Sequence, residues 1–199
     1  MASHPNPYLS RVQILALLLL LSGLFFRVIR VDLAPEVLPN FSPLMASALC
    51  GALLLPGVIG FILPLVALLL SDALLNLHYG VPLLSAQLLW TLPCYLIAIG
   101  IGWVLRERSV SLLPTLAGTL VASVIFYLVT NTGCWLGNIA YPLNFAGWLQ
   151  ALTVGLPGYP PTWSFLRNSL VSDLLFTALF VCVASSARSV RRTEETAVA

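Results

Sequence analysis

Two carboxylates stand inside long apolar runs of the sequence. Asp72 lies in the run 58–77, and Asp173 lies in the run 163–184. A charge at the centre of a membrane-spanning helix costs about 2.5–3.5 kcal/mol on insertion scales, so such residues usually face the interior of a helix bundle. We therefore expect both aspartates to point inward, where they could belong to a functional site or to an internal ion pair.

Three arginines lie at about the same predicted depth in the membrane as these two aspartates. Arg27 and Arg30 follow the first apolar run, and Arg167 lies near the start of the last one. Each could pair with an aspartate and offset part of the cost of burying it. Such a pair could either line a binding site or simply fix the packing of two helices. For Arg30 and Arg167 a third alternative is a side chain that reaches out to the membrane surface.

Other polar and aromatic residues lie in the same half of the predicted membrane bundle as these aspartates and arginines. Asn40 precedes the second apolar run, Asn131 and Trp135 follow the fifth, and Asn168 lies in the sixth. A few polar groups among aromatic side chains are typical of a small-molecule site. The ligand-binding residues that we predict are Asn40, Asp72, Asn131, Trp135, Arg167, Asn168 and Asp173.

Metal, cofactor and nucleotide sites have no matching pattern in this sequence. The four cysteines and two histidines are not spaced as metal ligands, and no phosphate-binding glycine motif occurs. We therefore expect no metal and no cofactor. Paired carboxylates can share a proton and activate water, so an intramembrane enzyme that uses Asp72 and Asp173 is an alternative to a binding protein.

Composition decides the class of protein. The chain has 199 residues, of which 59% are hydrophobic and 8% are charged, whereas a soluble domain carries about 25% charge. A small soluble fold leaves too much surface exposed to hide so many apolar side chains. The net charge of +2 does not indicate a nucleic-acid partner. The sequence therefore indicates an integral membrane protein in contact with the lipid bilayer.

Helices are the expected elements, because an unpaired backbone cannot face lipid. We expect an all-α bundle of six transmembrane helices in a single domain, residues 1–199. The predicted spans are approximately 12–28, 43–55, 58–77, 83–105, 112–130 and 163–185. The connection 131–162 is expected to be a lid-like loop. Within it, Phe145, Trp148, Leu149 and Leu152 recur at helical spacing, which predicts a short helix along the membrane surface.

Arginines also predict the orientation. Six spans place both termini on one side, and cytoplasmic loops carry an excess of basic residues. The arginines on the side of the termini are Arg11, Arg106, Arg108, Arg188, Arg191 and Arg192, against Arg27, Arg30 and Arg167 on the other side. We therefore expect a multi-pass protein of the inner or plasma membrane with both termini in the cytoplasm.

Short motifs in a fixed order support this architecture. They are Asn40-Phe41-Ser42-Pro43, Leu69-Leu70-Ser71-Asp72, Asn131 with Trp135, Tyr141-Pro142, and Arg167-Asn168-Ser169-Leu170 with Asp173. This set resembles an uncharacterised family of six-helix bacterial membrane proteins, which look like the substrate-binding (S) components of energy-coupling-factor (ECF) vitamin transporters. The resemblance implies a vitamin-like ligand bound near the outer face under a roof of loops.

The same resemblance implies a partner, a transmembrane coupling subunit with ATPases. Many S components carry paired alanines four residues apart in the first span to dock that subunit. Here the corresponding segment is Ala16-Leu17-Leu18-Leu19-Leu20, which leaves open whether the protein couples to such a module or acts alone. Our leading interpretation is a substrate-binding subunit of a small-molecule uptake transporter rather than an enzyme. A membrane scaffold is a further alternative.

Overall fold

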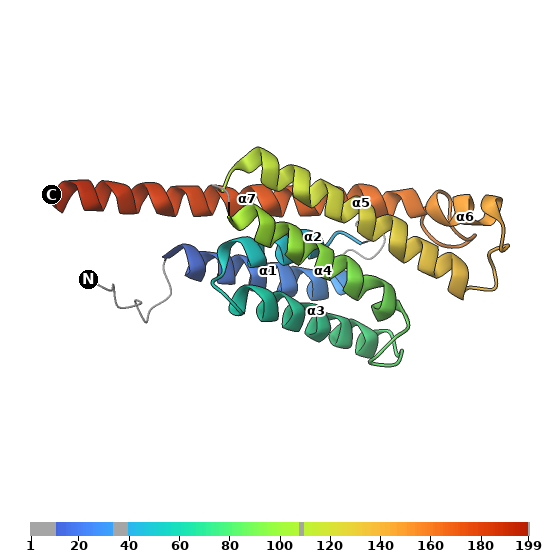
Figure 1. Ribbon diagram of the computed structural model, residues 1–199. Coiled ribbons are helices and arrows are strands. Elements are labelled where there is room, and N and C mark those ends of the chain that lie inside the picture. Colours follow the sequence, from blue (N-terminus) through green and yellow to red (C-terminus); the bar gives the residue numbers. More distant parts are fainter. Residues whose placement is uncertain (1–10, 34–39, 108–109, 199) are drawn as a thin grey trace.

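The computed structural model describes residues 11–33, 40–107 and 110–198, with the side chains at 11–12, 30–33 and 187–198 left out. Within these ranges the chain is helical and contains no strand (Figure 1). The helices are α1 (Arg11–Leu33), α2 (Leu44–Leu54), α3 (Ile59–His78), α4 (Gln87–Arg106), α5 (Leu112–Gly137), α6 (Phe145–Leu152) and α7 (Thr162–Val198).

Four helices are long and apolar enough to cross a membrane. They are α3, α4, α5 and the part Thr162–Ser186 of α7. Two further apolar stretches are shorter, Gln13–Ile29 in α1 and Leu44–Leu54 in α2. A straight span needs about 20 residues, so α2 with its 11 residues falls well short. The membrane class predicted from composition is supported, and within the part of the chain that the structure describes, length and composition show four candidate spans.

The predicted helix boundaries hold to within about five residues except at the ends of the fifth and the last span. We expected the last span to end at residue 185, but α7 continues to Val198. We expected the fifth span to end at residue 130, but α5 continues to Gly137. The side chain of Asn131 donates to the carbonyl of Tyr127, 2.8 Å away, and Thr132 donates to the carbonyl of Leu128 at 2.7 Å. Both bonds follow the helix, so polar residues that read as a loop prolong it by two turns.

The short helix predicted inside the connection is present as α6. The Asn144 side chain caps its first turn by accepting a hydrogen bond from the backbone N–H of Gly147, 2.9 Å away. Trp148 donates from its ring nitrogen to the Thr132 hydroxyl at 3.0 Å. The Tyr127 hydroxyl donates to the carbonyl of Leu152. These bonds hold α6 against the end of α5.

The short helix α2 is the centre of the bundle. It contacts α1, α3, α4, α5 and α7, and every residue from Met45 to Leu54 is buried. Small side chains allow this crowding. A methyl group placed on Gly102 of α4 would lie 2.3 Å from the carbonyl oxygen of Leu49 in α2, so the two backbones meet almost directly.

The long helices surround α2. Along the chain, α1, α2, α3, α4, α5 and α7 alternate in direction (Figure 1). The start of α1 and the end of α7 lie at one end of the bundle. At the opposite end α1 and α3 finish, α2 and α4 begin, and the connection from α5 through α6 to α7 turns back. We call this second end the cleft end, because the cavities described below lie there.

Candidate functional site

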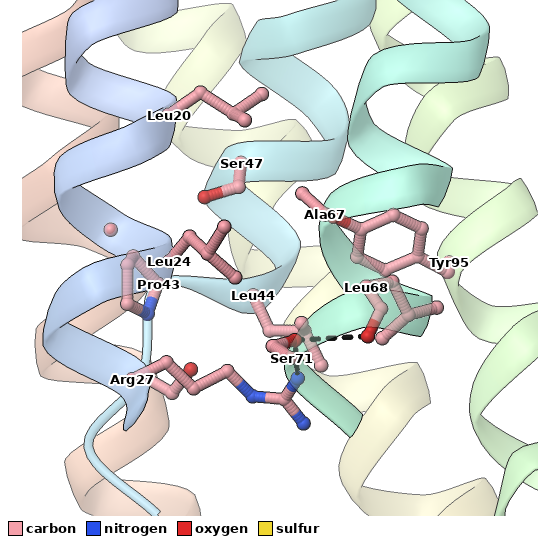
Figure 2. Close-up of a pocket in the computed structure, with 12 residues that line it drawn as sticks. Leu20, Leu24, Arg27, Pro43, Leu44, Ser47, Ala67, Leu68, Ser71 and Tyr95 are labelled. Carbon is pink, nitrogen blue, oxygen red and sulfur yellow. Dashed lines mark hydrogen bonds between the residues drawn. The ribbon is translucent and has the colours of Figure 1, made fainter. Parts of the chain in front are cut away.

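An ion pair joins two helices at the cleft end. Arg27 of α1 lies 2.5 Å from a carboxylate oxygen of Asp72 in α3, and the two side chains are 14% and 21% exposed. The guanidinium also donates to the hydroxyl of Ser71 (Figure 2). Ser71 in turn donates to the carbonyl of Leu68, 2.9 Å away. Asp72 therefore points inward and pairs with an arginine, as its position in an apolar run predicted. The side chain of Arg30, the other arginine of that helix end, lies outside the described residues.

Asp173 is buried, as predicted, with 1% of its surface exposed. One oxygen accepts from the backbone N–H of Ala46 at 3.0 Å, and the other lies 2.7 Å from the Ser123 hydroxyl. The arginine partner that the sequence left open for Asp173 is not found among the described residues, since the groups bonded to it are neutral. The physical reason is that the first N–H groups of a helix lack intrahelical partners and carry partial positive charge.

The position of Asp173 explains how α2 begins. The residue that precedes α2, Pro43, offers no capping side chain. Asp173 of α7 takes that role from across the bundle by accepting from the backbone N–H of Ala46. The carboxylate thus satisfies a backbone donor that would otherwise be buried without a partner, which costs about 1–3 kcal/mol for such a group.

Two adjoining chambers open beside these side chains. The first, of about 260 Å³, is lined by Arg27, Asp72 and Asp173 together with hydroxyl and amide groups, and we call it the charged chamber. The second, of about 420 Å³, has no formally charged residue in its lining, and we call it the neutral chamber. The residues that line both chambers are Asn40, Tyr79, Gln87, Phe126 and Ser169.

A third cavity lies behind Arg27, between α1, α2 and α3 (Figure 2). Its volume of about 20 Å³ has room for roughly one water molecule. Ser42 lines both this cavity and the charged chamber. The residue is 5% exposed, and its buried hydroxyl has no hydrogen-bond partner among the described residues. The two chambers, and not this small cavity, are large enough for an organic ligand.

Four of the seven predicted residues line the chambers. Asp72 and Asp173 line the charged chamber, Asn131 lines the neutral one, and Asn40 lines both. Asn40 has a φ of 57°, in the left-handed region that Asn tolerates better than most residues. Its side-chain nitrogen donates to the Ser169 hydroxyl at 2.8 Å, and that hydroxyl reaches the Asn40 carbonyl at 3.2 Å.

The other three predicted residues are absent from the chamber linings. Trp135 donates from its ring nitrogen to the carbonyl of Pro142 at 2.9 Å. Arg167 is exposed, with its guanidinium carbon 5.3 Å from the centre of the Trp163 ring, as expected for a side chain that reaches to the membrane surface. Asn168 is 4% exposed, and its side-chain oxygen accepts from Arg167 at 3.1 Å.

Sequence reasoning overlooked several residues of the lining. Gln87, Tyr79 and Phe126 line both chambers but were not among the predicted ligand-binding residues. Gln87 had a detectable signal, because an amide side chain inside the predicted span 83–105 is costly to bury unless it is hydrogen-bonded. Phe126 had none, because an aromatic residue in an apolar helix usually serves packing or the membrane interface.

The side chains of this site can make hydrogen bonds, ion pairs and aromatic contacts. In the described ranges, no three His, Cys, Asp or Glu side chains come close enough together to hold a metal ion. The chambers instead combine two carboxylates, one guanidinium, amides and hydroxyls with aromatic rings. This mixture is typical of sites that orient a small organic molecule.

Comparison with other proteins places the chain in a family but not next to a protein of established activity. No curated protein matches the sequence, and no solved structure matches the fold. A family model does match, over residues 7–195, which is nearly the whole chain. The chain therefore belongs to DUF6580, a family of unknown function.

Proposed function

We propose that this protein is the membrane-embedded, substrate-binding subunit of a small-molecule uptake transporter, with a vitamin-like ligand. The observation that carries the proposal is the pair of adjoining chambers at one end of an apolar helix bundle. Their combined size suits a compact organic molecule, and their lining offers few polar groups among aromatic walls.

The proposal includes six membrane crossings. Four are the long apolar helices, and the other two are α1 and α2, whose apolar stretches are shorter. The whole of α1 has 23 residues, enough to cross a bilayer. The residues of α2 are buried by the surrounding helices, and a short helix or irregular backbone is tolerated at membrane depth when protein covers it. The alternating helix directions agree with this reading (Figure 1).

The orientation also belongs to the proposal. With both termini in the cytoplasm, as the excess of arginines on their side favours, the cleft end faces outward. Ligand would then enter from outside, and the α6 segment would cover it. Pro160, which follows α6, lines the neutral chamber, so this connection forms part of the chamber wall.

The energy source would be a transmembrane coupling subunit with ATPases, as in the ECF S components that the sequence resembles, or else the protein works alone. Catalysis by the two aspartates is less favoured. Asp72 is paired with Arg27, and Asp173 is bonded to Ala46 and Ser123. Carboxylates with separate partners have no shared proton to exchange, which the enzymatic alternative requires.

Mass spectrometry of molecules extracted from the purified protein tests the proposal. We expect a small organic molecule to co-purify with the wild-type chain and to be lost from Asp72→Asn and Asn131→Leu. Arg167→Gln is the matched control, because its side chain is exposed and lies outside both chamber linings. A molecule retained by both cleft variants but lost from the control would overturn this site, and reproducible turnover of a substrate would overturn the binding role.

A further inference from the structure

The charged groups of the cleft already have partners within the protein. Arg27 and Asp72 form an ion pair at 2.5 Å, and Asp173 is held by the start of α2 and by Ser123. A ligand that brought its own net charge into the chambers would have to break one of these arrangements or remain uncompensated. Either outcome is costly away from water, so the cleft is better suited to a neutral ligand.

Two of the residues shared by the two chambers, Asn40 and Gln87, carry amide side chains, and these leave one acceptor and one donor group available. The Ser169 hydroxyl donates its hydrogen to the Asn40 carbonyl, so it must accept from the Asn40 side-chain nitrogen. The orientation of the Asn40 amide is thereby fixed. Its Oδ1 has no partner among the described residues and lies on a residue that both chambers touch.

Gln87 provides the complementary group. Its Oε1 faces the thiol of Cys134 at 3.8 Å, which leaves Nε2 as a donor without a bonding partner in the described part of the chain. Gln87 also lines both chambers, and its side chain is exposed to them. Together, Asn40 and Gln87 present an acceptor and a donor on two residues that line both chambers.

We propose that the cleft takes a neutral, planar ring compound with an amide-type edge, a donor next to an acceptor, which Asn40 Oδ1 and Gln87 Nε2 recognise. This inference rests on the proposed binding function and names its ligand class. The ring lies in the neutral chamber, whose walls include Phe126, Tyr127 and Phe165. Aromatic walls favour a flat ring by area and by stacking, while the amide edge satisfies groups that otherwise depend on water.

Three probes of nearly equal shape test the assignment: benzamide, benzoate and benzylamine, which are neutral, anionic and cationic at pH 7. Binding to the full-length protein in detergent is measured by calorimetry and by the shift in melting temperature. We expect benzamide to bind at least about tenfold more tightly than either charged probe, as the loss of one or two hydrogen bonds implies.

The variants Gln87→Met and Gln87→Glu locate the contact. Gln87→Met removes the donor at nearly constant length and should weaken benzamide about tenfold. Gln87→Glu replaces the donor with a charged acceptor, so the order should reverse in favour of benzylamine. Gln13→Met is the matched control, since it makes the same change in α1 at the other end of the bundle, and it should leave all three affinities unchanged.

The outcomes separate this inference from the proposed function. Preference for benzoate or benzylamine by the wild-type chain overturns the neutral ligand class and leaves small-molecule binding intact. Failure of all three probes to bind also overturns the class, while the co-purified molecule decides the binding role on its own. An unchanged benzamide affinity in both Gln87 variants removes Gln87 from the contact.

Discussion

The carboxylate of Asp173 accepts a hydrogen bond from the backbone N–H of Ala46, 127 residues earlier in the chain and 3.0 Å away. The last helix of the bundle thereby caps the first turn of the central one. A residue that the sequence marks as chemically active thus has a structural role as well as a place in the lining of the charged chamber. Substitutions of Asp173 can separate its contribution to stability from its contribution to ligand binding.

We predict that Asp173→Ala lowers the free energy of unfolding by about 3 kcal/mol, because a buried backbone donor and Ser123 lose a charged partner. Asp173→Asn should recover part of this loss, since one amide oxygen can still accept. Melting temperatures of the ligand-free protein give the comparison. A residue that served only the ligand would instead leave these temperatures unchanged and abolish the ligand-induced shift.

The ion pair between Arg27 and Asp72 should show coupling in a double-mutant cycle. Arg27→Gln and Asp72→Asn each leave a partly buried charge without its partner, whereas the double variant leaves none. We expect the losses in unfolding free energy of the two single variants, added together, to exceed the loss in the double variant by about 1–3 kcal/mol. Thermal unfolding of the four proteins in one detergent measures this difference. Additive losses would show that the pair is only a contact without net stabilisation.

Close packing between α2 and α4 predicts a position-specific effect of a single methyl group. Gly102→Ala would place its Cβ 2.3 Å from the carbonyl oxygen of Leu49, so the two helices must separate, at a cost of about 1–3 kcal/mol. Gly100→Ala, two residues away in the same helix, meets no atom within 4 Å. It should leave stability unchanged or raise it by up to about 1 kcal/mol through helix propensity. Equal effects of the two variants in unfolding experiments would contradict this packing.

The proposed orientation can be checked by cysteine labelling in intact cells. In a background with Cys134→Ser, Glu195→Cys should resist a membrane-impermeant thiol reagent, because the proposed orientation, drawn from the arginine distribution, has that end in the cytoplasm. Ile139→Cys, at a fully exposed position beyond the end of α5, should react rapidly. Reaction at position 195 together with protection at 139 would invert the topology and move the cleft to the inner face.

The sequence predicted the burial and pairing of Asp72 because an unpaired charge inside an apolar helix is energetically costly. Asp72 in an apolar run needed a cation at the same depth, and Arg27 was one of the arginines that stood there. The partner of Asp173 could not be foreseen in the same way. Its donor is the backbone of Ala46, and a backbone N–H is available only because α2 begins at that point and lies in the centre of the bundle.

The end of α5 shows the limit of reading polar residues as loops. Asn131 and Thr132 have low helix propensity, yet each donates its side chain to a carbonyl four residues earlier and so remains inside the helix. Asn131 reaches the neutral chamber from that position, while Trp135, one turn further, donates to Pro142 instead. Which side of the helix faces the cleft depends on the register set by its packing against α4 and α7.

The burial of α2 also constrains the order in which the molecule can be completed during synthesis. Eleven residues are too few to be held by lipid as an independent span, and the carboxylate that caps this helix belongs to the final one. Until α7 has packed against it, the first turn of α2 lacks the carboxylate that accepts from Ala46 and the wall that α7 provides. A chain truncated before Asp173 therefore keeps its central helix but leaves the start of that helix without this partner.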